Sequence, residues 1–231
     1  MASDILEEGI SLYERENYSA ALAYFLSLPQ ESDADSAELA YYLGLTYAKL
    51  KRYDDALLYL EQVVTSASEE MTASEAKRVL QCRFLLAVIY CLSGRKKLAD
   101  FELNKLLEIG YNRSQVNAAL AYIAWQQGEA ERCIDYYAES LALNENNATA
   151  LNGMGYVLAC EGHDLTKALS YCKKALSMAP DSPACLDSLG WVYYKMGIDS
   201  EAKKYLYKAQ KKAPDNKEIA AHIEEAERGA E

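Results

Sequence analysis

Small residues recur at a nearly constant interval along this chain of 231 residues. Six of them stand 35, 43, 34, 34 and 35 residues apart: Gly9, Gly44, Ala87, Ala121, Gly155 and Gly190. A fixed period of this length is typical of chains built from repeated pairs of helices, because two helices approach closely only where a side chain is small. The spacing therefore predicts six repeats.

Each repeat carries further positions that indicate a helical hairpin. A second small residue follows the first by twelve positions, or by thirteen in the fifth repeat: Ala21, Ala56, Ala99, Cys133, Ala168 and Ala202. A usually bulkier residue comes four positions later, on the same helix face: Phe25, Leu60, Leu103, Tyr137, Cys172 and Leu206. Glycines separate the two helices in the last four repeats, at Gly94, Gly128, Gly162 and Gly197. With only 4 prolines and 11 glycines, the chain is predicted to be all-α.

The last repeat, residues 183–216, resembles the tetratricopeptide repeat. The matching residues are Leu186, Leu189, Gly190, Tyr193, Ala202, Leu206, Ala209 and Pro214. The resemblance covers residues 2–216 and is weakest in the third repeat, where Arg83 takes an apolar place. It implies a right-handed superhelical solenoid with repeats at 2–36, 37–79, 80–113, 114–147, 148–182 and 183–216. Residues 217–231 look like the polar capping helix that such arrays need.

The 43-residue spacing departs from the period of the family. Residues 66–78 add about nine residues between the second and third repeats and contain neither proline nor glycine. We expect extra turns on one or both flanking helices, and a loop is the alternative.

A second stripe of side chains on the first helix of each repeat is not needed for packing within its own hairpin. In a stack of such hairpins these stripes line the concave side. The candidate groove residues are Tyr13, Tyr41, Lys49, Phe84, Tyr122, Trp125, Gln126, Asn152, Tyr156, Asp187, Trp191, Tyr194 and Lys195. Tyrosine and tryptophan often dominate binding energy, so the stripe predicts a groove for an apolar or aromatic segment of a partner protein or peptide.

Burial of some of these side chains against the next repeat is an open alternative. It applies to the residues directly after the small positions: Ile10, Leu45, Val88, Tyr122, Tyr156 and Trp191. Exposure is expected for Tyr13, Tyr41, Trp125, Asn152, Asp187 and Tyr194. A clamp for a partner's terminal carboxylate is disfavoured, because Lys49 and Lys195 are far apart in the array.

No motif in the sequence carries catalytic chemistry. His163 and His222 are the only histidines, no metal-ligand spacing surrounds them, and we expect both at the surface. Neither a phosphate-binding loop nor a nucleophile motif is present. The sequence therefore predicts no enzyme, no metal and no cofactor.

Charge and cysteine usage limit the partners and the compartment. The net charge of −11 disfavours nucleic acid. The six cysteines form no CxxC pair and are expected to be reduced, which favours the cytoplasm. The longest apolar stretch, residues 84–92, is too short for membrane insertion, and no export signal is visible. If a leader was removed, the compartment is instead the periplasm or envelope, since the last two repeats also resemble those of bacterial envelope adaptors.

The leading hypothesis is a protein-binding adaptor or scaffold within a larger assembly, such as an envelope, secretion or motility complex. The alternative is a homo-oligomer that assembles head to tail. Residues 1–80 carry 15 acids and 6 bases, whereas residues 166–217 carry 5 acids and 10 lysines. Four of these lysines form a stripe on the last repeat: Lys204, Lys208, Lys211 and Lys212. A solvated outer face is the simpler explanation for that stripe.

Overall fold

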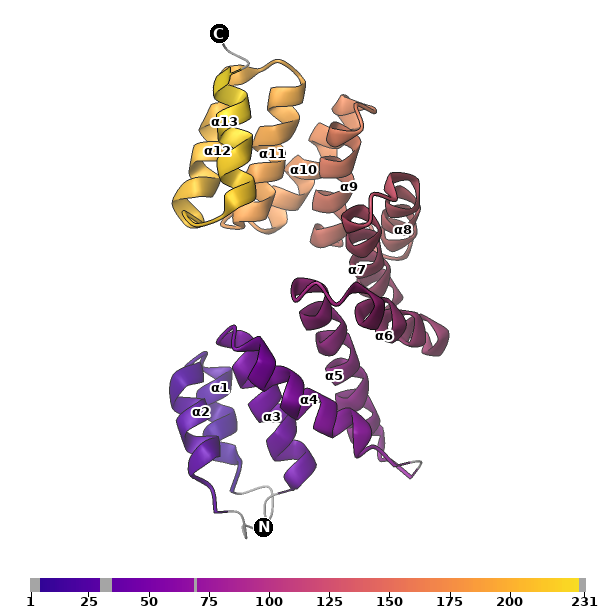
Figure 1. Ribbon diagram of the computed structural model, residues 1–231, viewed down its shortest axis with the longest axis vertical. Coiled ribbons are helices and arrows are strands. Elements are labelled where there is room, and N and C mark those ends of the chain that lie inside the picture. Colours follow the sequence, from indigo (N-terminus) through magenta and orange to yellow (C-terminus); the bar gives the residue numbers. More distant parts are fainter. Residues whose placement is uncertain (1–4, 30–34, 69, 229–231) are drawn as a thin grey trace. The chain divides into compact units, whose positions relative to one another are not determined.

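The computed structural model describes residues 5–29, 35–68 and 70–228, which form thirteen α-helices and no strand (Figure 1). The expectations for residues 2–4 and 30–34 in the first repeat, residue 69 in the second repeat and residues 229–231 in the capping segment lie outside these described ranges. The chain divides into an N-terminal half, Met1–Tyr111, and a C-terminal half, Asn112–Glu231. Both halves are all-α stacks of helical hairpins, as the resemblance implied.

Each hairpin consists of two consecutive helices. The N-terminal half contains α1 (Glu7–Glu14), α2 (Tyr18–Ser27), α3 (Ser36–Lys49), α4 (Tyr53–Thr65), α5 (Ala73–Leu92) and α6 (Lys96–Ile109). The C-terminal half contains α7 (Arg113–Gln126), α8 (Ala130–Leu143), α9 (Ala148–Cys160), α10 (Leu165–Met178), α11 (Pro183–Lys195), α12 (Asp199–Lys212) and α13 (Lys217–Arg228). Within each half, the second helix of a hairpin also packs on the first helix of the next hairpin.

The recurring small residues lie where the two helices of a hairpin come closest. A β-carbon added to Gly44 would lie 2.7 Å from Cδ2 of Leu60, and one added to Gly190 would lie 2.8 Å from Cγ of Leu206. At Gly155 the facing side chain is the smaller Cys172, yet its Sγ would still lie only 2.5 Å away. These contacts confirm that the predicted small and bulky positions face each other across the hairpin.

A residue with positive φ ends the first helix of every hairpin, seven positions after the small residue. In the last four hairpins it is glycine: Gly94, Gly128, Gly162 and Gly197. In the first two hairpins the same place holds Glu16, with φ of 60°, and Lys51, with φ of 59°. The turn is therefore the same in all six hairpins, although the sequence shows its glycine in only four of them.

Short polar side chains begin several of the helices by accepting backbone N–H groups. They are Asp35, Thr72, Asn147, Asp164 and Ser182. Such caps satisfy donors that have no partner inside the helix. At α11 the cap is followed by Pro183, whose fixed φ suits the first helical turn.

The additional residues before the third repeat divide between a longer helix and a longer connection. Helix α5 has 20 residues, against 14 in α3, and it starts from a capping box formed by Thr72 and Glu75. The expected boundary between residues 79 and 80 therefore falls inside α5, because this cap starts the helix at Ala73. The connection before the cap, from Ser66 to Thr72, includes one residue outside the described ranges.

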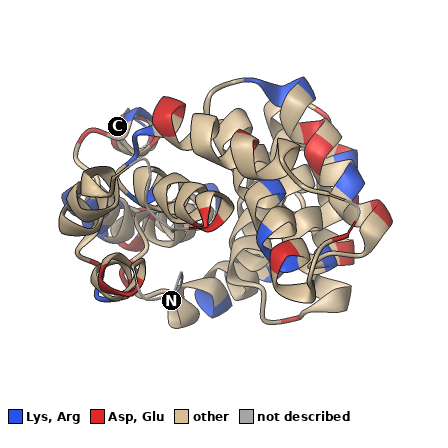
Figure 2. Ribbon diagram, turned by 90° about the horizontal axis from the view of Figure 1, so that it is seen from below, with Lys and Arg blue, Asp and Glu red and all other residues tan. Residues whose placement is uncertain are grey.

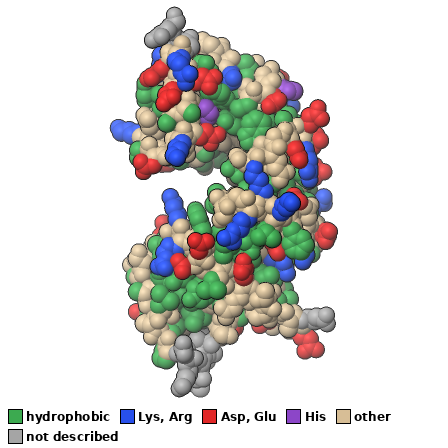
Figure 3. Space-filling view, viewed as in Figure 1, with side chains coloured by type: hydrophobic (Ala, Val, Ile, Leu, Met, Phe, Trp, Pro, Cys, Tyr) green, Lys and Arg blue, Asp and Glu red, His purple; other side chains and the backbone are tan. Residues whose placement is uncertain are grey.

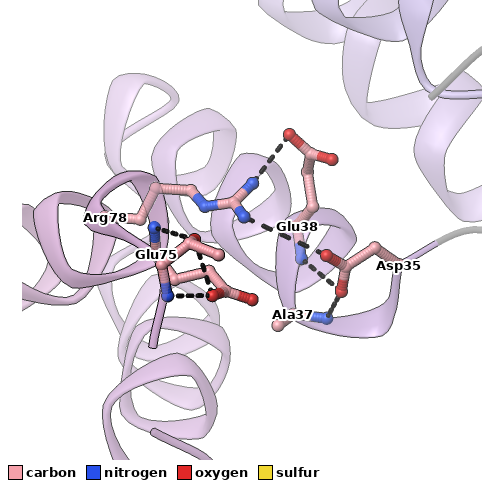
Figure 4. Close-up of polar contacts among 6 residues, drawn as sticks. Asp35, Ala37, Glu38, Glu75 and Arg78 are labelled. Carbon is pink, nitrogen blue, oxygen red and sulfur yellow. Dashed lines mark hydrogen bonds and ion pairs between the residues drawn. The ribbon is translucent and has the colours of Figure 1, made fainter. Parts of the chain in front are cut away.

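The added turns of α5 also reach across to α3. Arg78 lies 2.7 Å from Glu38 and 4.0 Å from Asp35, the residue that caps α3 (Figure 4). The guanidinium is mostly shielded, so this contact pins the N-terminal end of α5 against the start of α3.

Helix α13 covers the apolar end of the last hairpin. Its Ile219, Ile223 and Ala226 pack against Leu206 and Ala209 of α12, while its opposite side is charged. This arrangement matches the polar capping helix expected from the sequence. Within residues 5–29, 35–68 and 70–228, no helix has the length and apolar character needed to cross a lipid bilayer.

Candidate partner-binding surface

Three successive first helices of the C-terminal half bring a series of aromatic rings together. Trp125 of α7 meets Tyr156 of α9 edge to face, with 6.0 Å between the ring centroids. On α11, Trp191 and Tyr194 lie 5.2 Å apart. We call Tyr122, Trp125, Tyr156, Trp191 and Tyr194 the C-terminal aromatic surface. All five lie on the stripe that the sequence predicts for the first helices.

The surface is open at its α7 end and more covered toward α11. Tyr122 is 43% exposed, Trp125, Tyr156 and Tyr194 are half-buried, and Trp191 is only 6% exposed. Two exposed polar residues border it: Gln126 and Lys195, whose Nζ lies 4.8 Å from the centre of the Trp191 ring. Figure 3 shows hydrophobic side chains of all types at the molecular surface among charged ones.

The chain's own capping helix covers the α11 end. His222 of α13 stacks on Trp191, with 4.2 Å between ring centroids, and its Nδ1 lies 2.9 Å from Asp187. From the same helix, Glu218 accepts a hydrogen bond of 3.0 Å from the Tyr156 hydroxyl. The sequence expectations of an exposed Asp187 and a surface His222 were both wrong, because α13 buries the two groups against each other.

Asn152 of α9 is half-buried, although we expected it to be exposed. Its side-chain oxygen is shielded from solvent and has no hydrogen-bond partner among the described residues. The neighbouring α7–α8 hairpin instead holds a satisfied polar network in which Ser114, Ser140 and Asn147 bind one another at 2.7–3.3 Å. That network fixes the start of α9, which carries Asn152 and Tyr156.

The stripe of the N-terminal half is less open than expected. Tyr41, expected to be exposed, is 9% exposed and donates a 2.9 Å hydrogen bond to Gln81 of α5. Burial, the largest cause, raises the pKa of Tyr41 to about 12. Tyr13 is half-buried and lies 5.4 Å from the ring of Tyr18.

Lys49 and Phe84 complete the predicted stripe in this half. Lys49 is exposed, and its Nζ lies 5.6 Å from the centre of the Tyr18 ring. Phe84 of α5 is half-buried. The packing of α5 along α4 and its bond to Tyr41 explain why this stripe presents less aromatic surface than the one in the C-terminal half.

The residues directly after the small positions follow no single rule. Leu45 and Trp191 are buried, Tyr122 is exposed, and Ile10, Val88 and Tyr156 are half-buried. Trp191, for example, is covered by His222 of the capping helix, a contact that the repeat pattern does not encode.

Burial changes the acidity of two groups near the surface, the Cys160 thiol and the Tyr156 hydroxyl. Burial raises the pKa of the Cys160 thiol, while the indole of Trp191 and the hydroxyl of Tyr156 oppose this effect. Burial likewise raises the pKa of Tyr156 far above its usual value. Over residues 5–29, 35–68 and 70–228, no group of three His, Cys, Asp or Glu side chains is arranged to hold a metal ion. What the surface offers is aromatic area with polar edges.

Known proteins with similar sequences match between about a third and most of this chain. TPR repeat-containing protein PA4667 of Pseudomonas aeruginosa is 41% identical over 85 residues, which cover 37% of this chain and 14% of that protein. Photosystem I assembly protein Ycf3 of Prochlorococcus marinus is 35% identical over 77 residues, covering 32% and 44%. BBSome complex member BBS4 of Bos taurus is 26% identical over 196 residues, covering 84% and 35%. The chain thus spans less than half the length of each of these relatives.

Solved structures show the same fold. The crystal structure of the APC/C hetero-tetramer Cut9-Hcn1 matches 97% of this chain and 42% of that one, with a TM-score of 0.75 and 15% identity. The MamA structure matches 77% and 91%, with a TM-score of 0.51 and 21% identity. Family models described as tetratricopeptide repeat match residues 6–70 and 118–183, and residues 184–216. Together with the six hairpins, these matches show that the chain belongs to the tetratricopeptide-repeat family.

Proposed function

We propose that this chain is a protein-binding adaptor that holds an apolar or aromatic segment of a partner against the C-terminal aromatic surface. One observation carries the proposal: the first helices α7, α9 and α11 present a run of aromatic rings, and those of Tyr122, Trp125, Tyr156 and Tyr194 reach solvent in full or in part. Solenoids of this kind use their extended concave surfaces for binding.

The names of the relatives agree with a role in assemblies. One is a photosystem I assembly protein, another is a member of the BBSome complex, and a structural match comes from an APC/C hetero-tetramer. For this chain we propose the same general role, as a scaffold in a larger complex.

The open end of the surface determines the chemistry of the partner. Tyr122 and Trp125 supply accessible aromatic area on α7, while Tyr194 and Lys195 supply a ring and a cation on α11. A segment with an apolar or aromatic anchor suits this arrangement, because large rigid rings bind at low cost in side-chain entropy. Truncating one such hot-spot ring typically costs about 2 kcal/mol of binding free energy.

Affinity capture with the purified chain tests the proposal. A Trp125→Ala, Tyr194→Ala double variant is expected to lose the partner that the unmodified chain recovers. A matched control, Tyr136→Ala with Tyr207→Ala, removes two tyrosines from the second helices α8 and α12, and it is expected to keep the partner. Equal recovery by both variants, with circular dichroism showing that both are folded, would contradict the aromatic surface as the binding site.

Head-to-tail self-assembly receives less support from the structure. Lys204 pairs with Glu201 and Lys212 pairs with Asp181, so part of the lysine stripe is already neutralised within the chain. Acidic and basic residues are interspersed along the helices (Figure 2). Sedimentation at low and high salt separates the two proposals, since charge-driven assembly weakens as salt screens it. A monomer at low salt and high protein concentration would exclude self-assembly of this type.

A further inference from the structure

The buried histidine of the capping helix makes contacts that a cap does not need. His222 is 7% exposed, and its Nδ1 lies 2.9 and 3.0 Å from the two oxygens of Asp187, which is itself 6% exposed. Its ring stacks on Trp191 at 4.2 Å. Its Nε2 lies 3.4 Å from the Tyr156 hydroxyl of α9. The apolar docking of α13 on α12 uses other residues, Ile219 and Ile223.

The hydrogen bonds around the ring account for its protons. Burial raises the pKa of Tyr156, so the hydroxyl keeps its single proton near neutral pH. The hydroxyl oxygen lies 3.0 Å from the exposed Glu218 carboxylate, which can only accept, and 3.4 Å from Nε2 of His222. Once the proton goes to the closer carboxylate, the hydroxyl has only lone pairs to offer to Nε2. Nε2 then bonds only as a donor, and Nδ1 is already a donor to Asp187.

A histidine that donates from both nitrogens is an imidazolium cation, and the other neighbours suit that charge. The Asp187 carboxylate faces it directly, and the flat face of Trp191 attracts a cation stacked on it. The half-buried Cys160 lies beside Tyr156 and Trp191 and keeps its proton because burial raises its pKa. Lys195, whose Nζ lies 4.8 Å from the centre of the Trp191 ring, is exposed to solvent.

We propose that Asp187, Trp191 and Tyr156 form a receptor for one protonated imidazole, which the chain fills with its own His222, so that proton binding holds α13 on α9 and α11. The inference does not depend on the proposed partner. By linkage, a docked state that binds an additional proton becomes less favourable as pH rises.

Hydrogen exchange of the α13 amides in the full chain tests the proposal. Because a free histidine loses its proton near pH 6.5, protection of α13 relative to global unfolding should fall by about tenfold between roughly pH 6 and pH 9. In His222→Gln, which keeps a polar side chain but cannot carry the charge, protection should be lower at pH 6 and should not change with pH. An equal pH dependence in this variant, or none in the unmodified chain, would overturn the proposal.

Chemical rescue with imidazole gives a second measurement. If His222 had a purely structural role, the rescue would not depend on pH. In His222→Ala, added imidazole should restore the protection of α13 at pH 6 more strongly than at pH 9, because the Asp187 carboxylate and the Trp191 face attract the cation more strongly than the neutral ring. Adding Asp187→Asn to His222→Ala should abolish the response. Rescue that is independent of pH, or unaffected by Asp187→Asn, would show that the receptor does not select the protonated ring.

Discussion

The guanidinium of Arg83 on α5 lies 2.7 Å from a carboxylate oxygen of Glu102 on α6, in an ion pair whose side chains are only 21% and 13% exposed. Arg83 stands where most repeats carry an apolar residue, and the third repeat is therefore the weakest match to the family. The structure shows how this exception is accommodated: the partner helix of the same hairpin supplies the opposite charge.

Removing one member of this pair should destabilise the N-terminal half. Glu102→Ala leaves a mostly shielded guanidinium without its partner, and we expect a loss of about 1–2 kcal/mol in the free energy of unfolding measured with urea, less than for a fully buried pair. Replacing both residues with leucine should recover most of the loss. A neutral effect of Glu102→Ala would show that water solvates Arg83 well enough without Glu102.

Glycine should improve the two turns that lack it. Lys51 has φ of 59°, a left-handed conformation that costs a residue with a β-carbon about 1–2 kcal/mol, whereas glycine adopts it freely. Glycine also has more conformational freedom to lose on folding, which offsets part of this gain. We therefore expect Lys51→Gly to raise the free energy of unfolding by about 0.5 kcal/mol. The matched reverse change, Gly94→Ala, should destabilise by about 1 kcal/mol, since a β-carbon there meets no atom within 4 Å and only the backbone is strained. Thermal unfolding measures both changes. A higher midpoint temperature for Lys51→Gly and a lower one for Gly94→Ala would support this turn geometry, whereas shifts of the same sign would contradict it.

The features predictable from the sequence are those that repeat. The approach of Gly190 to Leu206 recurs in hairpin after hairpin, so a single period revealed the fold and the stripe that carries Trp125 and Tyr194. Features that occur once were missed. No periodic signal marks the burial of His222 against Asp187, which depends on how α13 lies across α9 and α11.

The thiols should differ in reactivity according to burial. Burial raises the pKa of Cys82 and of Cys133 to about 12, so at a pH of about 8 only on the order of one in ten thousand of these groups is a thiolate. Cys91 and Cys160 are half-buried. In the folded chain, iodoacetamide should therefore modify Cys91 and Cys160 before the four buried cysteines, as read by peptide mass spectrometry. The order should disappear in denaturant; early labelling of Cys82 would reveal local opening of α5.

Local stability should rise from the N-terminal to the C-terminal half. Solenoids bury apolar surface only between neighbouring hairpins, so the array opens at its weakest interface. In the C-terminal half, one buried cluster runs without a break from Ala118 to Ala202, and α13 covers the last hairpin. The first two repeats lie before the long connection that ends at Thr72, where α5 begins.

We therefore expect the amide hydrogens of the first two repeats to exchange faster than those of repeats four to six, with the last two repeats the most protected. A protease of broad specificity should cut first within residues 66–78, and the cap at Thr72 narrows the expected site to the part before α5. Opening from the C-terminal end first, or uniform protection along the chain, would show that the strength of the repeat signature does not report local stability.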